Sequence, residues 1–430
     1  MFPRSFRPVY LPMSCCKVMR RRRGFVVALA AAVVLSGCGG SGGGGGGGGV
    51  TPAPPTNVAS VVVDAGPAVL PSASLNVLFV SVTICAPGTG NCATIDHVNV
   101  DTGSTGLRIL ASALPSSLSL ALASVNDAAS SAPLAECIQF ADGYSWGSLR
   151  TVDLKVGGEQ ASNLTIHVIG DAALPTAPTD CVNSGPSQIA ENTVEAFGAN
   201  GILGIGTFHE DCGPACSTGL VPGTYYICPA ANTCQNTTMA VTQQVQQPVA
   251  HFATDNNGVV VQLPAIGSAG AVTVSGSLIF GIDTQNNNSL GSATILQVDT
   301  SGNFITRYNN QTLTNSFIDS GSNAYFFTDG GIPDCTTSAG FYCPATVQTL
   351  SATNQGASGP VVVSDVQFNI ANTDALLKNN PAFNAFDNIG GHDTMGGSFD
   401  WGLPFFFGRK VFVAIENSST AAGNGPYYAY

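Results

Sequence analysis

Short segments rich in Val, Ile, Leu, Thr and Phe recur along the chain and are separated by Gly, Asn, Pro and Asp. Segments of this composition, in which apolar and polar residues tend to alternate, are typical of β-strands. Helical patterns are few and predict helices only over residues 112–123 and 241–252. The sequence therefore predicts a mostly β protein, with its clearest strands at residues 75–84, 149–156, 163–168, 259–263, 271–280, 293–298, 361–370 and 410–415.

Two short polar segments have the composition of hairpin turns, Val156-Gly-Gly-Glu159 and Asp255-Asn-Asn-Gly258. The second of these, and Asp283-Thr-Gln-Asn-Asn-Asn288, could also be read as calcium loops. Neither has the full run of ligands with a distal Glu that a calcium loop requires. We therefore predict turns at these places.

The N-terminal segment has the pattern of a bacterial export signal. Arg20 to Arg23 precede an apolar run over residues 25–35, and Leu35-Ser-Gly-Cys38 follows as a lipobox. We expect residues 1–37 to be a lipoprotein signal peptide and Cys38 to be the lipidated residue, although the run could instead remain as an uncleaved anchor. Met13 or Met19 would give a more ordinary signal length.

Residues 38–56 are rich in glycine and end in a proline-containing stretch, which predicts a flexible tether. A phosphate-binding loop is the alternative, but no Gly-Lys-Ser/Thr and no flanking strand and helix accompany the glycines. Gly39 follows the expected lipidated cysteine, as in lipoproteins that are sorted to the outer membrane. We expect the protein to be exported and anchored by lipid, most simply at the periplasmic face of the outer membrane, with the cell surface as the alternative.

The expected mature protein is strongly acidic. Seven of the 14 basic residues precede Cys38 and none of the 26 acidic residues does, so residues 38–430 carry a formal charge of −19. The remaining basic residues are scattered and form no patch. This charge argues against nucleic acid or anionic headgroups as partners and allows neutral, polar or cationic substrates.

Ten cysteines follow Cys38, and an even number in an exported chain suggests disulfides. Four pairs are close neighbours in sequence, which leaves one pair by elimination. The four cysteines at positions 212, 216, 228 and 234 could also pair with one another differently. A zinc cluster is the rival interpretation for those four, although they lack a paired Cys-x-x-Cys spacing. The candidate pairs are Cys85 with Cys92, Cys137 with Cys181, Cys212 with Cys216, Cys228 with Cys234, and Cys335 with Cys343.

An Asp-Thr/Ser-Gly-Ser tetrad follows an apolar segment twice, at Asp101-Thr-Gly-Ser104 and Asp319-Ser-Gly-Ser322. Each tetrad suits a tight turn in which backbone N–H groups and hydroxyls hold the carboxylate. Taken alone, each would be an ordinary polar turn. If the two turns meet, however, their carboxyls cannot both ionise easily, so they would share a proton and hold a water between them.

Around these tetrads the chain resembles the pepsin-like aspartic peptidases, over most of residues 75–416. Further matching segments are a flap hairpin, an apolar-apolar-Gly segment that crosses beneath the first Asp turn, the C-terminal strand pair, and the passage between lobes. The resemblance implies a bilobal acid protease fold with one Asp turn per lobe, which fits a length of about 370 residues beyond the tether, more than one core usually holds. The segments are 140–158, 200–206, 401–416 and 276–283, and the implied lobes are residues 57–280 and 281–430.

The resemblance also implies a role for each residue of the tetrads. Asp101 and Asp319 would be the catalytic pair, one as general base and the other as acid. Thr102 and Ser320 would bond across the lobes, Gly103 and Gly321 would allow close approach, and Ser104 and Ser322 would bond the outer carboxylate oxygens. No metal or organic cofactor is expected. The expected substrate is an extended peptide or unfolded protein, and we expect a monomer.

The chain departs from the family pattern at three places. Phe140 stands where the flap has a tyrosine, with Gly143, Tyr144 and Trp146 following as candidate flap or substrate contacts. Arg108 replaces the tryptophan that supports the flap, and Pro404 stands where the second crossing segment has glycine, although Gly402 is close by. These changes keep open a catalytically silent lipoprotein that acts in binding or envelope interaction.

The sequence also has features of two other functional classes. Gly143-Tyr-Ser145-Trp-Gly147 fits the nucleophile elbow of serine hydrolases, but the alternating residues 149–156 that follow predict a half-exposed strand rather than a helix. A structural envelope lipoprotein with coincidental turns would place the two Asp residues far apart. The aromatic run at residues 405–407 is predicted to be core.

Overall fold

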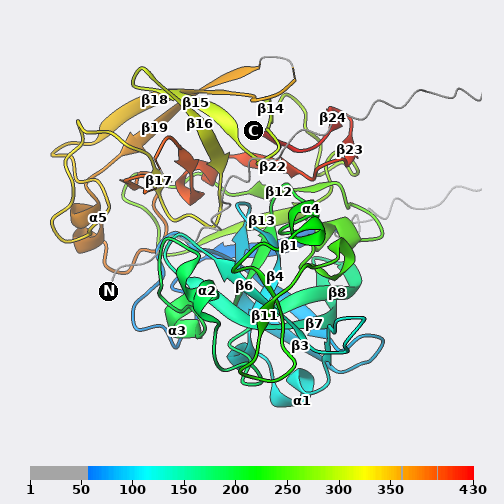
Figure 1. Ribbon diagram of the computed structural model, residues 1–430. Coiled ribbons are helices and arrows are strands. Elements are labelled where there is room, and N and C mark those ends of the chain that lie inside the picture. The colour runs from blue at the N-terminus through cyan, green and yellow to red at the C-terminus, as the bar shows by residue number, and fades with distance from the viewer. Residues whose placement is uncertain (1–56, 360–361, 395) are drawn as a thin grey trace, which may run out of the picture. The chain divides into compact units, whose positions relative to one another are not determined.

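Paired β-strands dominate the computed structural model, which describes residues 57–359, 362–394 and 396–430 (Figure 1). The described residues all belong to one unit by their contacts. The predicted signal peptide, Cys38 and the tether lie outside the described residues. The mostly β class is confirmed.

The largest sheet has sixteen strands and contains most of the N-terminal half of the chain together with the C-terminal strands. The path runs β11-β10-β6-β7-β8-β4-β9-β3-β2-β1-β13-β12-β22-β25-β14, with β5 beside β7 and an additional pairing of β7 with β2. Its strands are β1 (Val58–Val63), β2 (Leu78–Cys85), β3 (Cys92–Asp101), β4 (Thr105–Leu110), β5 (Ala123–Ser124), β6 (Leu134–Gln139), β7 (Tyr144–Val156), β8 (Glu159–Ile169), β9 (Gly201–Ile205), β10 (Tyr225–Ile227), β11 (Gln235–Asn236), β12 (Gly258–Gln262), β13 (Val274–Phe280), β14 (Ile295–Gln297), β22 (Lys410–Ala414) and β25 (Tyr427–Ala429).

A second sheet of seven strands belongs to the C-terminal half, drawn from yellow to red in Figure 1. Its order is β19-β18-β15-β16-β21-β17-β20, and a separate pair is formed by β23 and β24. The strands are β15 (Phe304–Tyr308), β16 (Gln311–Ile318), β17 (Tyr325–Phe326), β18 (Gln348–Gln355), β19 (Val363–Ile370), β20 (Gly390–Gly391), β21 (Asp400–Trp401), β23 (Ser419–Thr420) and β24 (Gly423–Asn424).

Helices in the described residues are short. Among them, none is long and apolar enough to cross a membrane. The α-helices are α1 (Ser116–Ser119), α2 (Thr179–Asn183), α3 (Val194–Phe197), α4 (Pro214–Thr218) and α5 (Thr373–Asn379), and the 3-10 turns are η1 (Ala111–Ala113), η2 (Val241–Gln243), η3 (Val249–His251) and η4 (Leu403–Phe406).

The two predicted helices are therefore wrong. Residues 112–123 form only part of η1 and the single turn α1, and Pro115 stands between them. Residues 241–252 contain only η2 and η3, because Pro248 restricts the residue before it and the buried side chains of Gln244 and Gln247 bond to backbone groups of neighbouring loops.

One of the two predicted hairpins is confirmed. Val156 pairs with Glu159, and Gly157 and Gly158 have φ of 55° and 86°, which a two-residue hairpin of this kind requires. Asp255 to Gly258 instead form a bend that leads from η3 into β12, so the hairpin prediction there is wrong. The Asp255 carboxylate accepts hydrogen bonds from the side chains of Thr284 and Gln285, which holds that bend.

The core combines aliphatic strand residues with a group of stacked and edge-packed rings in the second sheet. The rings of Phe399 and Trp401 are stacked with centroids 4.2 Å apart, and the Trp401 indole donates to Thr306 Oγ1 at 3.2 Å. The aromatic run at residues 405–407 is buried, as predicted.

The described residues contain five disulfides, which confirm all five candidate pairs: Cys85–Cys92, Cys137–Cys181, Cys212–Cys216, Cys228–Cys234 and Cys335–Cys343. The cysteines for which a zinc cluster or a different pairing was considered are therefore joined as sequence neighbours.

Candidate active site

The two Asp turns begin at the ends of strands that have a parallel neighbour. Asp101 is the last residue of β3 and lies opposite Gly204 of β9. Asp319 directly follows β16, and its N–H donates to the carbonyl of Trp401 in β21 at 3.0 Å. In each half of the chain, a crossing segment therefore supports the backbone that carries the carboxyl group.

The two turns contact each other through a reciprocal set of hydrogen bonds. Thr102 Oγ1 donates to the carbonyl of Ile318 at 2.9 Å and accepts from the N–H of Ser320 at 2.9 Å. In the mirrored arrangement, Ser320 Oγ donates to the carbonyl of Val100 at 2.7 Å and accepts from the N–H of Thr102 at 3.1 Å. Residues 218 positions apart are thus joined by their hydroxyls, as the resemblance implied.

The glycine of each turn lies against the carboxyl group of the other. A Cβ added to Gly103 would lie 2.7 Å from Asp319 Cγ, and one added to Gly321 would lie 2.7 Å from Asp101 Oδ1. Each glycine N–H also donates to the carboxylate of its own turn, at 2.7 Å for Asp101 and 2.8 Å for Asp319. The absence of side chains at these two positions is what allows the carboxyl groups to approach.

Both carboxyl groups are fully buried. Burial raises the pKa of Asp101, while the Asp319 and Ser104 side chains, the Gly103 amide and the charge of Arg108 oppose that rise. Ser322 Oγ donates to Asp319 Oδ2 at 2.8 Å, as expected. Ser104 holds the equivalent position in the Asp101 turn, but its Oγ makes no hydrogen bond of normal geometry to the Asp101 carboxyl group. It is still near enough to favour the ionised form of Asp101.

The predicted flap hairpin is formed by β6 and β7, and its turn is closed by a bond from the Phe140 N–H to the Gly143 carbonyl at 2.7 Å. Phe140 is buried in an apolar cluster, with its ring edge-on to Phe197. Trp146 donates to the carbonyl of Leu174 at 2.9 Å and is buried in a different cluster. Substrate contact by these residues stays a prediction.

Gly143 and Tyr144, the other two candidate flap residues, lie beside residues 189–191. Tyr144 is buried, and its backbone exchanges hydrogen bonds with Ile189 and Glu191. Gly143 is also close to this segment, since a Cβ there would lie 2.6 Å from Glu191 Cδ. The start of β7 is therefore fixed by residues 189–191.

Ser145 does not occupy a nucleophile elbow. It lies in antiparallel β7 opposite Ile138, and its Oγ donates to the carbonyl of Glu191 at 3.1 Å. Gly147 is needed for close packing, because a Cβ there would lie 1.9 Å from the carbonyl oxygen of Val168. The motif is explained by the hairpin.

Glycine is retained in the second crossing segment. Trp401 pairs with Ile318, and Gly402 follows at the position where a Cβ would lie 2.1 Å from the carbonyl oxygen of Ala324. Leu403 then donates to the carbonyl of Ser322 at 2.7 Å. Pro404, for which a replacement of glycine was predicted, lies two residues further on in η4.

Sequence analysis missed the partners of Arg108. This fully buried guanidinium contacts Glu136 at 2.7 Å and Asp211 at 3.0 Å. The signal was an arginine within the apolar segment 107–110, since a buried cation requires a buried anion. Nothing in the sequence indicated which acidic residues would supply it.

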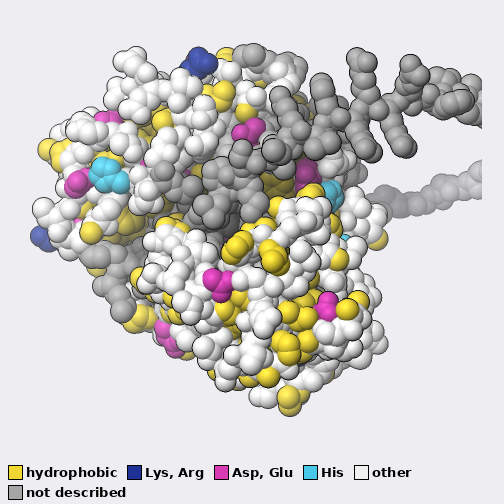
Figure 2. Space-filling model, viewed as in Figure 1, with side chains coloured by type: hydrophobic (Ala, Val, Ile, Leu, Met, Phe, Trp, Pro, Cys, Tyr) yellow, Lys and Arg dark blue, Asp and Glu magenta, His cyan; other side chains and the backbone are white. Residues whose placement is uncertain are grey.

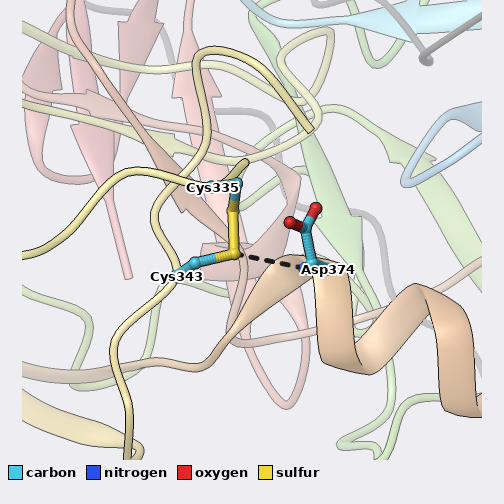
Figure 3. Close-up of side chains that lie close together, drawn as sticks. All are labelled: Cys335, Cys343 and Asp374. Carbon is cyan, nitrogen blue, oxygen red and sulfur yellow. Dashed lines mark hydrogen bonds between the residues drawn. A yellow bond between two sulfur atoms is a disulfide. The ribbon is translucent and has the colours of Figure 1, made fainter. Parts of the chain in front are cut away.

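Three side chains that could in principle ligate a metal lie together at Cys335, Cys343 and Asp374 (Figure 3). The two sulfurs form a disulfide, so they are not available as thiolates. The Asp374 carboxylate accepts from the N–H groups of Thr337 and Ser338 at 3.0 and 2.8 Å. This group therefore fixes the loop at α5 and offers no ordinary metal site.

Fold and site together define a mostly β protein in which one Asp-Thr/Ser-Gly-Ser turn from each half of the chain meets the other and places two carboxyl groups side by side. By sequence, the chain belongs to the family DUF3443, described as a protein of unknown function, whose family model matches residues 53–430. No curated protein matches the chain. Among solved structures, the aspartic proteinase from Irpex lacteus is similar, with 15% identity and a TM-score of 0.48 over 86% of this chain and 96% of that one.

Proposed function

We propose that the protein is an aspartic endopeptidase that hydrolyses peptide bonds with a water activated between Asp101 and Asp319. The observation that carries this proposal is the reciprocal bonding of the two turns by Thr102 and Ser320, with the glycines leaving room for the carboxyls. An ordinary polar turn is stabilised by hydrogen bonds within the turn itself. Here the hydroxyls also bond the backbone of the other turn, which aligns the two carboxyl groups with each other.

The proposed reaction requires one proton on the pair. In the proposed mechanism this proton would be carried by Asp101, whose pKa is raised by burial. Asp319, which accepts hydrogen bonds from the Gly321 N–H and Ser322 Oγ, would be the ionised partner. Ionised Asp319 would then take a proton from water as it attacks the peptide carbonyl. Protonated Asp101 would donate its proton to the carbonyl oxygen, which gives a tetrahedral gem-diol. As the C–N bond breaks, Asp319 would pass the proton it took from water to the leaving amine, and Asp101 would take a proton back from one hydroxyl of the intermediate.

The substrate class follows from this chemistry and from the charge of the chain. An extended peptide or unfolded protein would bind between the two halves with the β6–β7 hairpin over it. Asp and Glu side chains lie singly on the face shown in Figure 2 rather than in one patch, so overall charge rather than a local acidic patch would favour cationic peptides there.

The test is cleavage of an unfolded protein mixture by the full-length chain across acid and neutral pH, with and without a statine-type inhibitor. We expect inhibitor-sensitive cleavage with a bell-shaped pH profile, and loss of cleavage in Asp101→Asn and in Asp319→Asn. Asp365→Asn is the matched control, because Asp365 is exposed in β19 and bonds only to Thr353 Oγ1 among the interactions described for it. A flat pH profile, or full activity in Asp101→Asn, would contradict the proposal.

A second candidate is a catalytically silent scaffold that binds a peptide or envelope partner. It is favoured by the complete burial of both carboxyls and by Phe140, which offers no hydroxyl where the flap was expected to have one. In that case neither the wild type nor Asp101→Asn would cleave, and both would bind the same partner with equal affinity.

We further propose that the protein is exported as a monomer and anchored by lipid at Cys38. This proposal depends on the sequence of residues 1–38 alone. Fractionation of cells expressing the wild type and Cys38→Ser tests it: the wild type should remain in the membrane fraction and the variant should leave it. Equal membrane retention would favour the uncleaved anchor.

A further inference from the structure

A buried group of charged and polar side chains lies directly behind the Asp101 turn. Arg108 Nε and Nη2 donate to Glu136 at 3.1 and 2.7 Å, which makes a bidentate pair, and Nη2 also donates to Asp211 at 3.0 Å. Tyr225 donates to Asp211 Oδ1 at 2.5 Å, and His167 Nδ1 lies 2.8 Å from Glu136 Oε2. We call these five residues the Arg108 cluster.

Strand pairing explains how the cluster forms. Arg108 of β4 lies opposite His167 of β8, and Glu136 of β6 lies opposite Gly147 of β7. Gly147 separates Glu136 from β8, and a Cβ there would lie 3.1 Å from His167 Nε2. A glycine in β7 therefore leaves the space in which the side chains of β4, β6 and β8 meet.

The cluster is joined to two parts of the proposed active site, the Asp101 turn and the β6–β7 hairpin. Arg108 Nη1 donates to the carbonyl of Thr105, the residue that follows the Asp101-Thr-Gly-Ser104 tetrad, at 2.7 Å. Its other nitrogens hold Glu136, which lies on the first strand of the predicted flap hairpin. One rigid guanidinium thus connects the Asp101 turn to that hairpin.

Tyr225 connects the cluster to a further segment. The Val245 N–H donates to Tyr225 Oη at 2.9 Å, and Val245 packs against the Asp101 turn, since a Cβ on Gly106 would lie 2.2 Å from Val245 Cγ1. The cluster therefore reaches the residues that follow the Asp101 tetrad at two points, through Thr105 and through Val245.

The ionisation states of the cluster follow from burial and mutual contact. Burial works against the charge of Arg108 and of Glu136, but their attraction prevails, so the pKa of Arg108 is raised and that of Glu136 is lowered. Burial, and then the nearby Glu136, raise the pKa of Asp211 well above its ordinary value. Burial lowers the pKa of His167 and raises that of Tyr225. The mutual contact of Arg108 and Glu136 therefore favours the charged form of each.

We propose that Arg108 is the positioning residue of this site, joining the Asp101 turn to the β6–β7 hairpin and presenting a fixed positive charge to the carboxyl pair. The inference rests on the proposed peptidase function for its catalytic meaning, but the mechanical link can be tested without catalysis. The titratable groups that the described residues place against Arg108 are Glu136 on β6, His167 on β8, Asp211 before α4 and Tyr225 on β10, with Asp101 at the end of β3.

The charge has a defined effect on the pH profile. Arg108 favours the ionised form of Asp101, so removing the guanidinium makes the pair harder to ionise. The acid limb of kcat/KM should then move to higher pH, by about half a unit for a buried charge that is not in direct contact. A residue that only filled space would leave this limb unchanged.

Two variants separate charge from geometry. Arg108→Lys keeps the charge but loses the bidentate fork, so we expect KM to rise while the acid limb stays in place. Arg108→Met with Glu136→Gln removes both charges and leaves no unpaired ion between them, so the acid limb should move upward. Arg150→Lys is the matched control, because Arg150, on strand β7 of the hairpin, pairs with Asp171 at 2.7 Å and makes no contact with the Asp101 turn among its described bonds.

Hydrogen exchange of residues 134–146 supplies the readout that does not need activity. Both Arg108 variants should exchange these hairpin amides at least tenfold faster than the wild type and Arg150→Lys. If the wild type cleaves but the Arg108 variants keep its KM, its acid limb and its exchange rates, the inference is wrong and the proposed function stands. If the wild type does not cleave, the proposed function fails, and the exchange rates alone decide whether Arg108 holds the hairpin.

Discussion

The hydroxyl of Thr102 offers the sharpest test of how the two halves of the site are held together. In Thr102→Val the side chain keeps its shape but loses its oxygen, which leaves the N–H of Ser320 and the carbonyl of Ile318 without this partner. Both bonds are buried, and each unsatisfied buried group costs roughly 1–3 kcal/mol. We therefore expect the free energy of unfolding to fall by about 3 kcal/mol.

Urea denaturation followed by tryptophan fluorescence, with the disulfides intact, measures this loss. With a slope of about 3 kcal/mol per molar urea, the midpoint should fall by about 1 M. Thr83→Val is the matched control, because the Thr83 hydroxyl bonds only to Thr94 Oγ1 in an exposed pair, so its loss should stay within about 0.5 kcal/mol. If Thr102→Val lowers the midpoint no further than Thr83→Val, the reciprocal bonds do not join the turns.

Three other changes test further features of the structure. Asp101→Asn should unfold at a higher temperature than the wild type near pH 7 and at the same temperature near pH 3: because the folded-state pKa of Asp101 is raised above the ordinary 3.8, wild-type stability falls as pH rises through that interval, and Asn removes this loss. Gly103→Ala should abolish inhibitor binding and lower stability by about 1–3 kcal/mol, because its Cβ would lie 2.7 Å from Asp319 Cγ. Replacing Cys137 and Cys181 by Ser should lower stability by about 4 kcal/mol, since the bond spans 44 residues.

Each of these changes has a control in the same chain. Asp365→Asn should show no pH-dependent gain in stability, and an equal gain there would contradict the role of burial. Gly90→Ala meets no atom within 4 Å and should be neutral, so equal effects at Gly90 and Gly103 would refute the close approach. The Cys212–Cys216 bond spans only 4 residues, and its removal should cost about half as much as that of Cys137–Cys181.

The strands and the residues of the Asp turns could be predicted from local sequence patterns. Alternation of apolar and polar residues reports which face of a strand is buried, and a Gly-Gly pair reports a hairpin turn, as at residues 156–159. Local pattern was misleading over residues 241–252, where buried Gln244 and Gln247 bond to distant backbone groups and separate the two 3-10 turns η2 and η3. Such bonds depend on which loops pack nearby.

The tetrads at Asp101 and Asp319 could be found as motifs, but their distance apart could not be read from spacing along the chain. That approach depends on two crossing segments, on two glycines that lack side chains, and on hydroxyls that bond backbone groups 216 to 220 positions away. Each of these contacts exists only after both halves have folded.

Arg108 shows most clearly the difference between what the sequence predicts and what the tertiary structure determines. A cation in an apolar segment predicts a buried anion, because an unpaired buried charge is strongly destabilising. Composition and periodicity establish the mostly β class and the chemistry available to the chain, since these depend on neighbouring residues. The choice of Glu136 and Asp211 as partners, and the meeting of the two carboxyls, depend on strand register and long-range packing, because groups far apart in sequence interact only once the sheets have brought them together.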